Sequence, residues 1–152
     1  MKMIKLFALL LCVILAACAP TGATQEAGGT QAAPASLDNT QWKLLFFREG
    51  EVETPVIDGS NLTLVFEADQ RAGGSGGCNS FGGTYQTQGE NLKFSDLVST
   101  LMACADMSLT DQEGQYMSKL QAAERYEISG DQLTIWHSGG NGRLIFTRAS
   151  AQ

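Results

Sequence analysis

The sequence predicts an α+β fold in which a compact, curved antiparallel β-sheet carries one main helix. Three observations favour this class. Apolar segments of strand length recur between residues 37 and 148, turn sequences containing Gly, Asp or Asn separate them, and one longer segment has helical periodicity. The length of 152 residues suits a single domain.

The first strands are expected at residues 41–47 and 62–66. The first of these segments is rich in aromatic and aliphatic side chains, and Gly50 follows it in a turn. In the second, apolar side chains occupy every other position, which places them on one face of a strand. A short apolar segment, 92–94, follows a Gly-containing turn and is expected to form a hairpin with residues 84–86.

Residues 71–85 are unusually rich in glycine, with Gly at positions 73, 74, 76, 77, 82 and 83. A Walker-type phosphate loop would end in Gly-Lys-Ser/Thr and lead into a helix, and this stretch does neither. A dinucleotide-binding loop would lie in a βαβ unit, whereas a hairpin is expected here. We therefore interpret these glycines as architectural, since glycine permits bulges, positive φ and close backbone approach in a curved sheet.

One helix is expected after this group of strands. The segment Thr110–Glu113 has the form of a capping box at a helix N-terminus. Tyr116, Leu120 and Ala123 would then share one apolar face of the helix. Three strands separated by Gly-containing turns are expected to end the domain, at residues 126–129, 133–137 and 143–147.

The N-terminus has the pattern of an export signal. Basic residues at positions 2 and 5 precede an apolar run, residues 6–15, that is too short to span a membrane. The run leads into Leu15-Ala16-Ala17-Cys18, which resembles the lipobox of bacterial lipoproteins. That resemblance implies a signal peptide over residues 1–17 and a lipid attached to Cys18. An ordinary signal peptide and a short membrane anchor are the alternatives.

Residues 18–36 contain no large apolar side chain and are expected to form a flexible, lipid-anchored tether. The folded domain is expected at 37–148, with a short tail at 149–152. Because Ala19 is not the Asp that typically retains lipoproteins at the inner membrane, the predicted location is the outer membrane, facing the periplasm. A Gram-positive cell surface is the alternative location, and for the tether the alternative is a segment that folds on binding a partner.

Composition and charge argue against several functional classes. The net charge of −6 and the sequence pI of about 4.6 do not suit nucleic-acid binding. A single histidine cannot supply a multi-histidine metal centre. We therefore expect no nucleic-acid partner, no metal and no cofactor, apart from the covalent lipid on Cys18.

Several motifs together resemble the META domain family, which includes the HslJ-like heat-shock proteins of bacteria. These motifs are Trp42-Lys43-Leu44, Gly76–Tyr85, Ser99–Cys104, Glu113–Leu120 and Leu144-Ile145-Phe146. The signature positions within them are Gly77, Cys78, Asn79, Phe81, Gly83, Tyr85, Met102, Ala103 and Cys104. Leu101 is a departure, because members often have a basic residue there. The resemblance implies a sheet-rich fold with a helix, frequent envelope location, and no established catalytic residues.

Cys78 and Cys104 are the two cysteines that would remain in the mature domain once Cys12 is removed with the signal peptide and Cys18 is acylated. In an oxidising envelope, such an even pair indicates a disulfide. Two buried free thiols, or a redox or metal role, are the alternatives.

Three further groups of residues are candidates for chemistry. His137 could form a catalytic dyad with Cys78 or Cys104, although a lone histidine after a strand is usually an ordinary strand residue. Asp106, Asp111 and Glu113 could bind calcium, but acidic residues are also common at helix N-termini. Asn79, Ser80 and Thr84 could line a small polar ligand site, and turn or bulge positions explain them as well.

The expected function is that of a non-catalytic, membrane-tethered lipoprotein of the cell envelope. A role in stress response or envelope maintenance, including heat shock and novobiocin resistance, is implied by the family resemblance alone. One alternative is a binding or inhibitor module that docks an envelope protein through exposed edges or aromatic side chains such as Trp136. The other is an enzyme that uses Cys78, Cys104 or His137.

Overall fold

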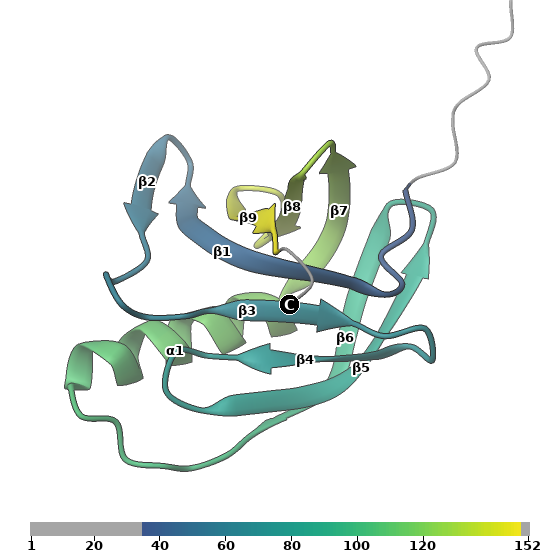
Figure 1. The fold of residues 1–152 in the computed structure, drawn as a ribbon. Helices are drawn as coiled ribbons and strands as arrows, with labels where there is room; N and C mark the ends of the chain where they lie inside the picture. Colours follow the sequence, from purple (N-terminus) through teal and green to yellow (C-terminus); the bar gives the residue numbers. More distant parts are fainter. Residues whose placement is uncertain (1–34, 150–152) are drawn as a thin grey trace, which may run out of the picture. The chain divides into compact units, whose positions relative to one another are not determined.

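A computed structural model describes residues 35–149 of the chain (Figure 1). The predicted signal peptide (1–17), Cys18, most of the tether and the last three residues lie outside the described residues, so these assignments stay predictions. No helix of residues 35–149 has the length and apolar character needed to cross a membrane.

Nine strands and one helix succeed one another along the described residues. They are β1 (Thr40–Glu49), β2 (Val52–Pro55), β3 (Thr63–Phe66), β4 (Arg71–Ser75), β5 (Ser80–Gln88), β6 (Asn91–Ser99), α1 (Met107–Gln121), β7 (Ala123–Ser129), β8 (Gln132–His137) and β9 (Gly142–Arg148).

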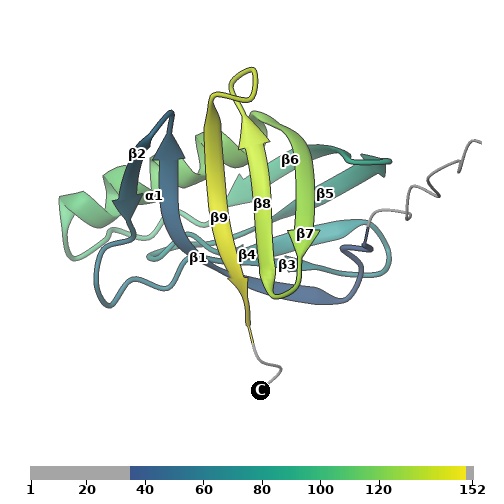
Figure 2. The same ribbon diagram turned by 90° about the horizontal axis from the view of Figure 1, so that it is seen from above.

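The sheet is closed into a barrel, which corrects the prediction of an α+β fold with a compact, curved antiparallel sheet. All pairings are antiparallel and run in the order β1-β3-β4-β5-β6-β7-β8-β9, and β9 pairs again with β1. Eight strands therefore form a barrel, and β2 is added outside this ring along β1 (Figure 2). The fold is mostly β, with one helix among the described residues.

The length and bend of β1 make the closure possible. The N-terminal part of β1 pairs with β3, from Thr40 to Lys43, whereas its opposite edge pairs with β9 from Trp42 to Glu49. An irregularity between Leu44 and Phe46 shifts the register with β9. Such bulges bend a strand and increase its twist, which lets one strand belong to both sides of a closing sheet.

The helix α1 closes one end of the barrel. Tyr116 and Leu120 on α1 are fully buried. The centre of the Tyr116 ring lies 5.8 Å from the ring centre of Phe81 on β5 and 6.3 Å from that of Phe146 on β9. Because β5 and β9 stand on opposite sides of the eight-stranded ring, a side chain that contacts both lies across the interior.

The core fills the barrel with inward-facing side chains from every strand of the ring. In β1 the buried residues alternate with exposed ones over Thr40–Leu45, as expected for a strand with one face inside. The fully buried large side chains are Trp42, Tyr116, Phe66, Phe146, Leu44, Leu62, Leu64, Leu92, Leu120, Leu133, Ile135 and Leu144. Among the described residues, the buried apolar side chains form one core that extends from Leu37 to Phe146.

The helix begins earlier than its predicted capping box. Asp106 is the N-cap, and its carboxylate accepts hydrogen bonds from the backbone N–H (2.8 Å) and the hydroxyl (2.9 Å) of Ser108. Thr110 and Glu113 therefore lie inside α1, and the capping-box interpretation is wrong. Ala123 belongs to β7 and not to the apolar face of the helix. Asp106 lies four residues before Thr110 and is also an acceptable N-cap, and its side chain accepts from a free N–H group at the start of the helix.

The glycine-rich stretch forms β4, β5 and the tight connection between them. Gly73 and Gly82 are cross-strand partners, and the register of β5 with β6 shifts between Gly82 and Thr84. A Cβ on Gly83 would lie 2.7 Å from the Ser95 carbonyl oxygen. The predicted bulge and close backbone approach are therefore present, within a barrel and not an open sheet.

Candidate functional site

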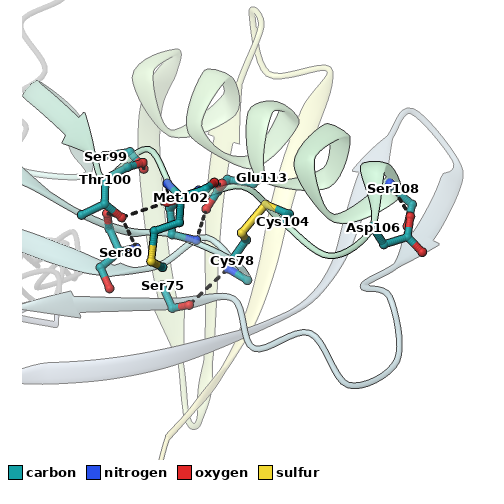
Figure 3. Close-up of a disulfide and its surroundings, with 12 residues drawn as sticks. Ser75, Cys78, Ser80, Ser99, Thr100, Met102, Cys104, Asp106, Ser108 and Glu113 are labelled. Atoms are coloured by element: carbon teal, nitrogen blue, oxygen red, sulfur yellow. Dashed lines mark hydrogen bonds between the residues drawn. A yellow bond between two sulfur atoms is a disulfide. The ribbon is translucent and has the colours of Figure 1, made fainter.

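Several signature residues of the middle motifs meet at one place, where the β4–β5 connection, the segment after β6 and the helix α1 come together (Figure 3). We call this place the junction and define it by Gly76, Gly77, Cys78, Asn79, Thr100, Met102, Cys104 and Glu113.

Asn79 is the centre of the junction. Its side-chain oxygen accepts hydrogen bonds from the backbone N–H of Met102 (2.7 Å) and the hydroxyl of Thr100 (2.9 Å). Its side-chain amide donates to the carboxylate of Glu113 (2.7 Å) and, more weakly, to the Met102 carbonyl (3.4 Å). One buried amide therefore joins three segments that lie far apart in the sequence.

Glu113 reaches into the junction from α1 and is itself buried, at 8% exposure. One carboxylate oxygen accepts from the backbone N–H of Asn79 and the other from its side-chain amide, both at 2.7 Å. Gly76 lies against the same carboxylate, and a Cβ there would overlap it. A buried carboxylate must keep its hydrogen-bond donors, and here they come from Asn79. Only glycine at position 76 leaves enough space for the Glu113 carboxylate to reach them.

Gly77 has a left-handed backbone conformation, with φ of +103°. A side chain at this position would be strained, and a Cβ would also lie 3.0 Å from the side chain of Leu62. The turn that Gly77 makes directs Cys78 and Asn79 toward the segment after β6.

Cys78 and Cys104 form a disulfide, with their Cα atoms 5.8 Å apart (Figure 3). Both cysteines are half-buried, and the bond connects the β4–β5 connection to the segment that leads into α1. The covalent link thus joins the same segments that Asn79 joins by hydrogen bonds.

The other signature residues belong to the barrel. Phe81 is buried and packs edge-on against Tyr116. Tyr85 is buried, and its hydroxyl bonds to the Asp38 carboxylate and to the Glu67 carbonyl, the latter at 3.2 Å. Burial, together with the Asp38 carboxylate, raises the pKa of Tyr85 well above that of an ordinary tyrosine. Ala103 is exposed.

Two buried contacts of α1 were not predicted. Gln112 accepts from the backbone N–H of Ile57 (2.7 Å) and donates to the Ser60 hydroxyl (3.0 Å). Tyr116 donates to the Thr63 carbonyl (3.1 Å), and its complete burial raises the pKa of its phenol. The available signal was spacing, because Gln112, Glu113, Tyr116 and Leu120 share one helix face.

His137 does not lie with the cysteines. Its ring is 1% exposed, with Nδ1 3.0 Å from the Ser138 hydroxyl and Nε2 3.7 Å from the Glu49 carboxylate. Burial lowers the pKa of His137, and the nearby Lys119 lowers it further. A dyad with Cys78 or Cys104 has no support in this geometry.

The proposed acidic and polar ligand sites are not assembled. Asp106 caps α1, and the hydrogen bonds from Ser108 lower the pKa of its carboxyl. Glu113 faces Asn79, while Asp111 is exposed. Asn79 is used inside the junction, whereas Ser80 and Thr84 are exposed on β5. The three acids therefore do not converge on one ion, and the three polar residues do not form one site.

Cys78, Cys104 and Glu113 are the one group of potential metal-ligating atoms that lies close together in residues 35–149, within 4.8 Å of one another. A metal would require thiolates, and in the disulfide the two sulfurs are bonded to each other. The oxidised junction is therefore suited to holding segments together.

An exposed apolar groove lies beside the junction. Its walls are the segment 99–104 and one side of α1. The groove has a volume of about 480 Å³ and is widely open to solvent. Elsewhere, Trp136 is half-buried, with the Arg125 guanidinium 3.7 Å from the centre of its ring.

Comparison with known proteins identifies a family and similar structures. The sequence pattern of the META domain family matches residues 35–151. An NMR structure of a protein from Burkholderia xenovorans is 26% identical, with a TM-score of 0.67, and the match covers 76% of this chain and 85% of that one. A crystal structure of a DUF4847 family protein from Bacteroides vulgatus is 14% identical, with a TM-score of 0.56, covering 76% and 96%. The latter likeness shows the fold alone, and no curated protein matches the chain.

Proposed function

Because the chain belongs to the META domain family, we propose that it is a non-catalytic, membrane-tethered protein of the bacterial cell envelope that acts in stress response or envelope maintenance. In this proposal residues 1–17 direct export, Cys18 carries the lipid, and the following residues connect the lipid to the domain. The lipid alone would hold the protein at the membrane, since buried acyl chains contribute about 0.8 kcal/mol for each methylene.

The observation that supports a non-catalytic role is the use of polar groups in the junction. Asn79 and Glu113 bond to each other, and Asn79 also bonds to Thr100 and Met102. The two cysteines are joined to each other. A nucleophile or general base needs a free reactive atom directed at a substrate, and these groups are directed at one another.

The tethering part of the proposal is tested with Cys18→Ala in a strain that lacks the gene. The wild-type protein is expected in the membrane fraction and restores growth under heat and envelope-active antibiotics. Cys18→Ala is expected to leave the membrane fraction and to restore growth poorly. A variant that stays membrane-bound and fully active would contradict lipid tethering through this residue.

The non-catalytic part is tested separately with His137→Ala and with Cys78→Ser combined with Cys104→Ser. Circular dichroism first establishes that each variant is folded. We expect folded variants to restore growth as the wild type does. Loss of complementation by a folded variant at normal abundance would favour the enzyme alternative.

Docking of an envelope protein is the second candidate function. It is favoured by one observation, the exposed apolar side chains around the groove beside the junction.

A further inference from the structure

The groove opens onto the junction, because the junction residues Asn79, Thr100, Cys104 and Glu113 also line it, and apolar side chains lie along its two walls. Leu101, Met102 and Ala103 line it from the segment after β6, and Thr110, Gly114 and Met117 line it from α1. We call these six residues the apolar groove. Met107 lies one helical turn before Thr110, so it extends the same side of α1.

Large apolar side chains are exposed here to an unusual degree. Leu101 is 98% exposed, Met107 81% and Met102 61%. A single exposed apolar residue is ordinary, whereas several together at the edge of a groove are typical of an interaction site. Methionine adapts its shape to different apolar partners, which suits a surface that receives a flexible segment.

Gly114 has no structural explanation within the domain. It lies in the interior of α1 and is exposed, and a Cβ at this position would meet no atom within 4 Å. Glycine weakens a helix interior relative to alanine, so an unneeded glycine there indicates another requirement. Because Gly114 has no side chain, the groove is wider at this point of the helical wall.

The chain segment that forms the groove is acidic. Between Lys93 and Lys119 the chain contains Asp96, Asp106, Asp111 and Glu113 but no Lys or Arg. Asp106 is the exposed N-cap of α1 and Asp111 is exposed in its second turn, and α1 supplies one wall of the groove. An occupant with apolar groups flanked by cations would match this surface, whereas an anionic lipid surface would be repelled.

We propose that the apolar groove binds a basic amphipathic peptide segment of an envelope protein, with apolar side chains between Leu101 and Gly114 and cationic side chains near Asp106 and Asp111. This inference rests on the docking candidate of the proposed function and names its surface and partner class. Helix-in-groove recognition of this type combines apolar anchors with charge complementarity at the rim.

The test uses residues 19–152, exported behind a conventional cleavable leader so that no lipid is attached. The probe is a short fluorescent peptide of leucine and lysine, and a leucine and glutamate peptide of the same pattern is its comparison. We expect the lysine peptide to bind, the glutamate peptide not to bind, and added salt to weaken binding.

Two groove variants and their controls locate the site. Leu101→Ser and Gly114→Leu are each expected to weaken binding about tenfold, one by removing an anchor and the other by filling the groove. Val52→Ser, which changes a side chain 66% exposed on β2, is the matched control and is expected to bind normally. Thermal unfolding should show that Gly114→Leu remains folded.

The charge is tested with Asp106→Asn combined with Asp111→Asn, since asparagine also caps helices. We expect weaker binding and a smaller effect of salt. Glu51→Gln combined with Asp58→Asn, both exposed and neither lining the groove, is the control for total charge.

Several results would overturn the proposal: equal binding of the two peptides, or unchanged binding by Leu101→Ser and Gly114→Leu. Sedimentation that shows self-association lost in Leu101→Ser would assign the groove to a second copy of the chain. Flotation with phosphatidylglycerol vesicles that depends on Leu101 would assign it to lipid. The peptide measurements need neither the anchor nor a growth phenotype, so they can fail while the Cys18 experiment succeeds, and the reverse.

Discussion

Asn79 shows how one side chain can determine the geometry of a whole region. Its amide has both a donor and an acceptor group, and the junction uses both of them. The Asn79 side chain is 5% exposed, so water cannot readily replace these bonds. The Glu113 carboxylate depends on the same residue for both of its hydrogen bonds.

We predict that Asn79→Ala lowers the free energy of unfolding by about 2–4 kcal/mol, because it leaves a buried carboxylate short of a donor and removes the acceptor for Met102. Urea unfolding measures the change. Asn61→Ala, at an exposed position, is the control and should change stability by less than about 0.5 kcal/mol. A loss at Asn79 no larger than at Asn61 would contradict the central role of Asn79.

His137 predicts a dependence of stability on pH. Its folded-state pKa lies below the ordinary value of 6.5, because burial disfavours the charged ring. As the pH falls below about 6.5, the unfolded chain takes up a proton that the folded chain does not, so stability decreases. Above that pH both states are neutral at this residue and the contribution is constant.

We therefore expect the stability difference between the wild type and His137→Gln to vary between pH 7 and pH 5, with the wild type losing more stability. Measuring the difference removes the contribution of the carboxylates, which titrate in both proteins. Parallel unfolding curves for the two proteins over this range would contradict the assignment.

At the scale of elements, the Cys78–Cys104 disulfide joins the β4–β5 connection to the segment that leads into α1. The hydrogen bonds of Asn79 and Glu113 join the same connection to that segment and to the helix. The disulfide spans 26 residues, from Cys78 before β5 to Cys104 before α1. The β5–β6 hairpin therefore lies inside the covalent loop.

Reduction of this disulfide is expected to lower the free energy of unfolding by about 3.5 kcal/mol, from the entropy of closing a loop of this length in the unfolded chain. Unfolding of the oxidised protein with and without dithiothreitol measures the effect, and Cys78→Ser combined with Cys104→Ser should reproduce it. If dithiothreitol changes the double variant as much as the wild type, the effect does not come from this bond.

At the scale of the whole molecule, closure gives every strand of the ring a paired neighbour on each side. The pairing between β6 and β7 is the shortest. β6 and β7 pair through Asn91 and Arg125, supported by a 2.8 Å bond from the Tyr126 N–H to the Glu90 carbonyl. β2 differs from the strands of the ring because it pairs with β1 and is exposed at all four residues. Pro55 in β2 offers no N–H, which suits an edge strand.

Hydrogen exchange tests the closure directly. In a closed ring β9 is paired with β8 and β1, so consecutive amides from Arg143 to Thr147 should be protected. In β2 one edge is free, and only alternate amides should be protected. Protection of alternate amides in β9 would contradict closure and would favour an open sheet.

The sequence by itself predicts most strands, the existence of one helix and the family, because these depend on local periodicity and on motifs. It places Cys78, Asn79 and Cys104 in one signature without indicating how Asn79 is used. The start of α1 was missed because Asp106 and Thr110 are both acceptable caps, and only packing of the helix selects between them.

The tertiary structure decided the closure, the junction and the groove. Pairing of β1 with β9 joins the two ends of the domain, and residues this far apart leave no local pattern in a single sequence. From the sequence, Glu113 could be an ion ligand or part of a helix cap. In the structure it is the hydrogen-bond partner of Asn79, because α1 packs against the β4–β5 connection. Such choices depend on long-range packing, since that is what determines which polar groups are removed from water together.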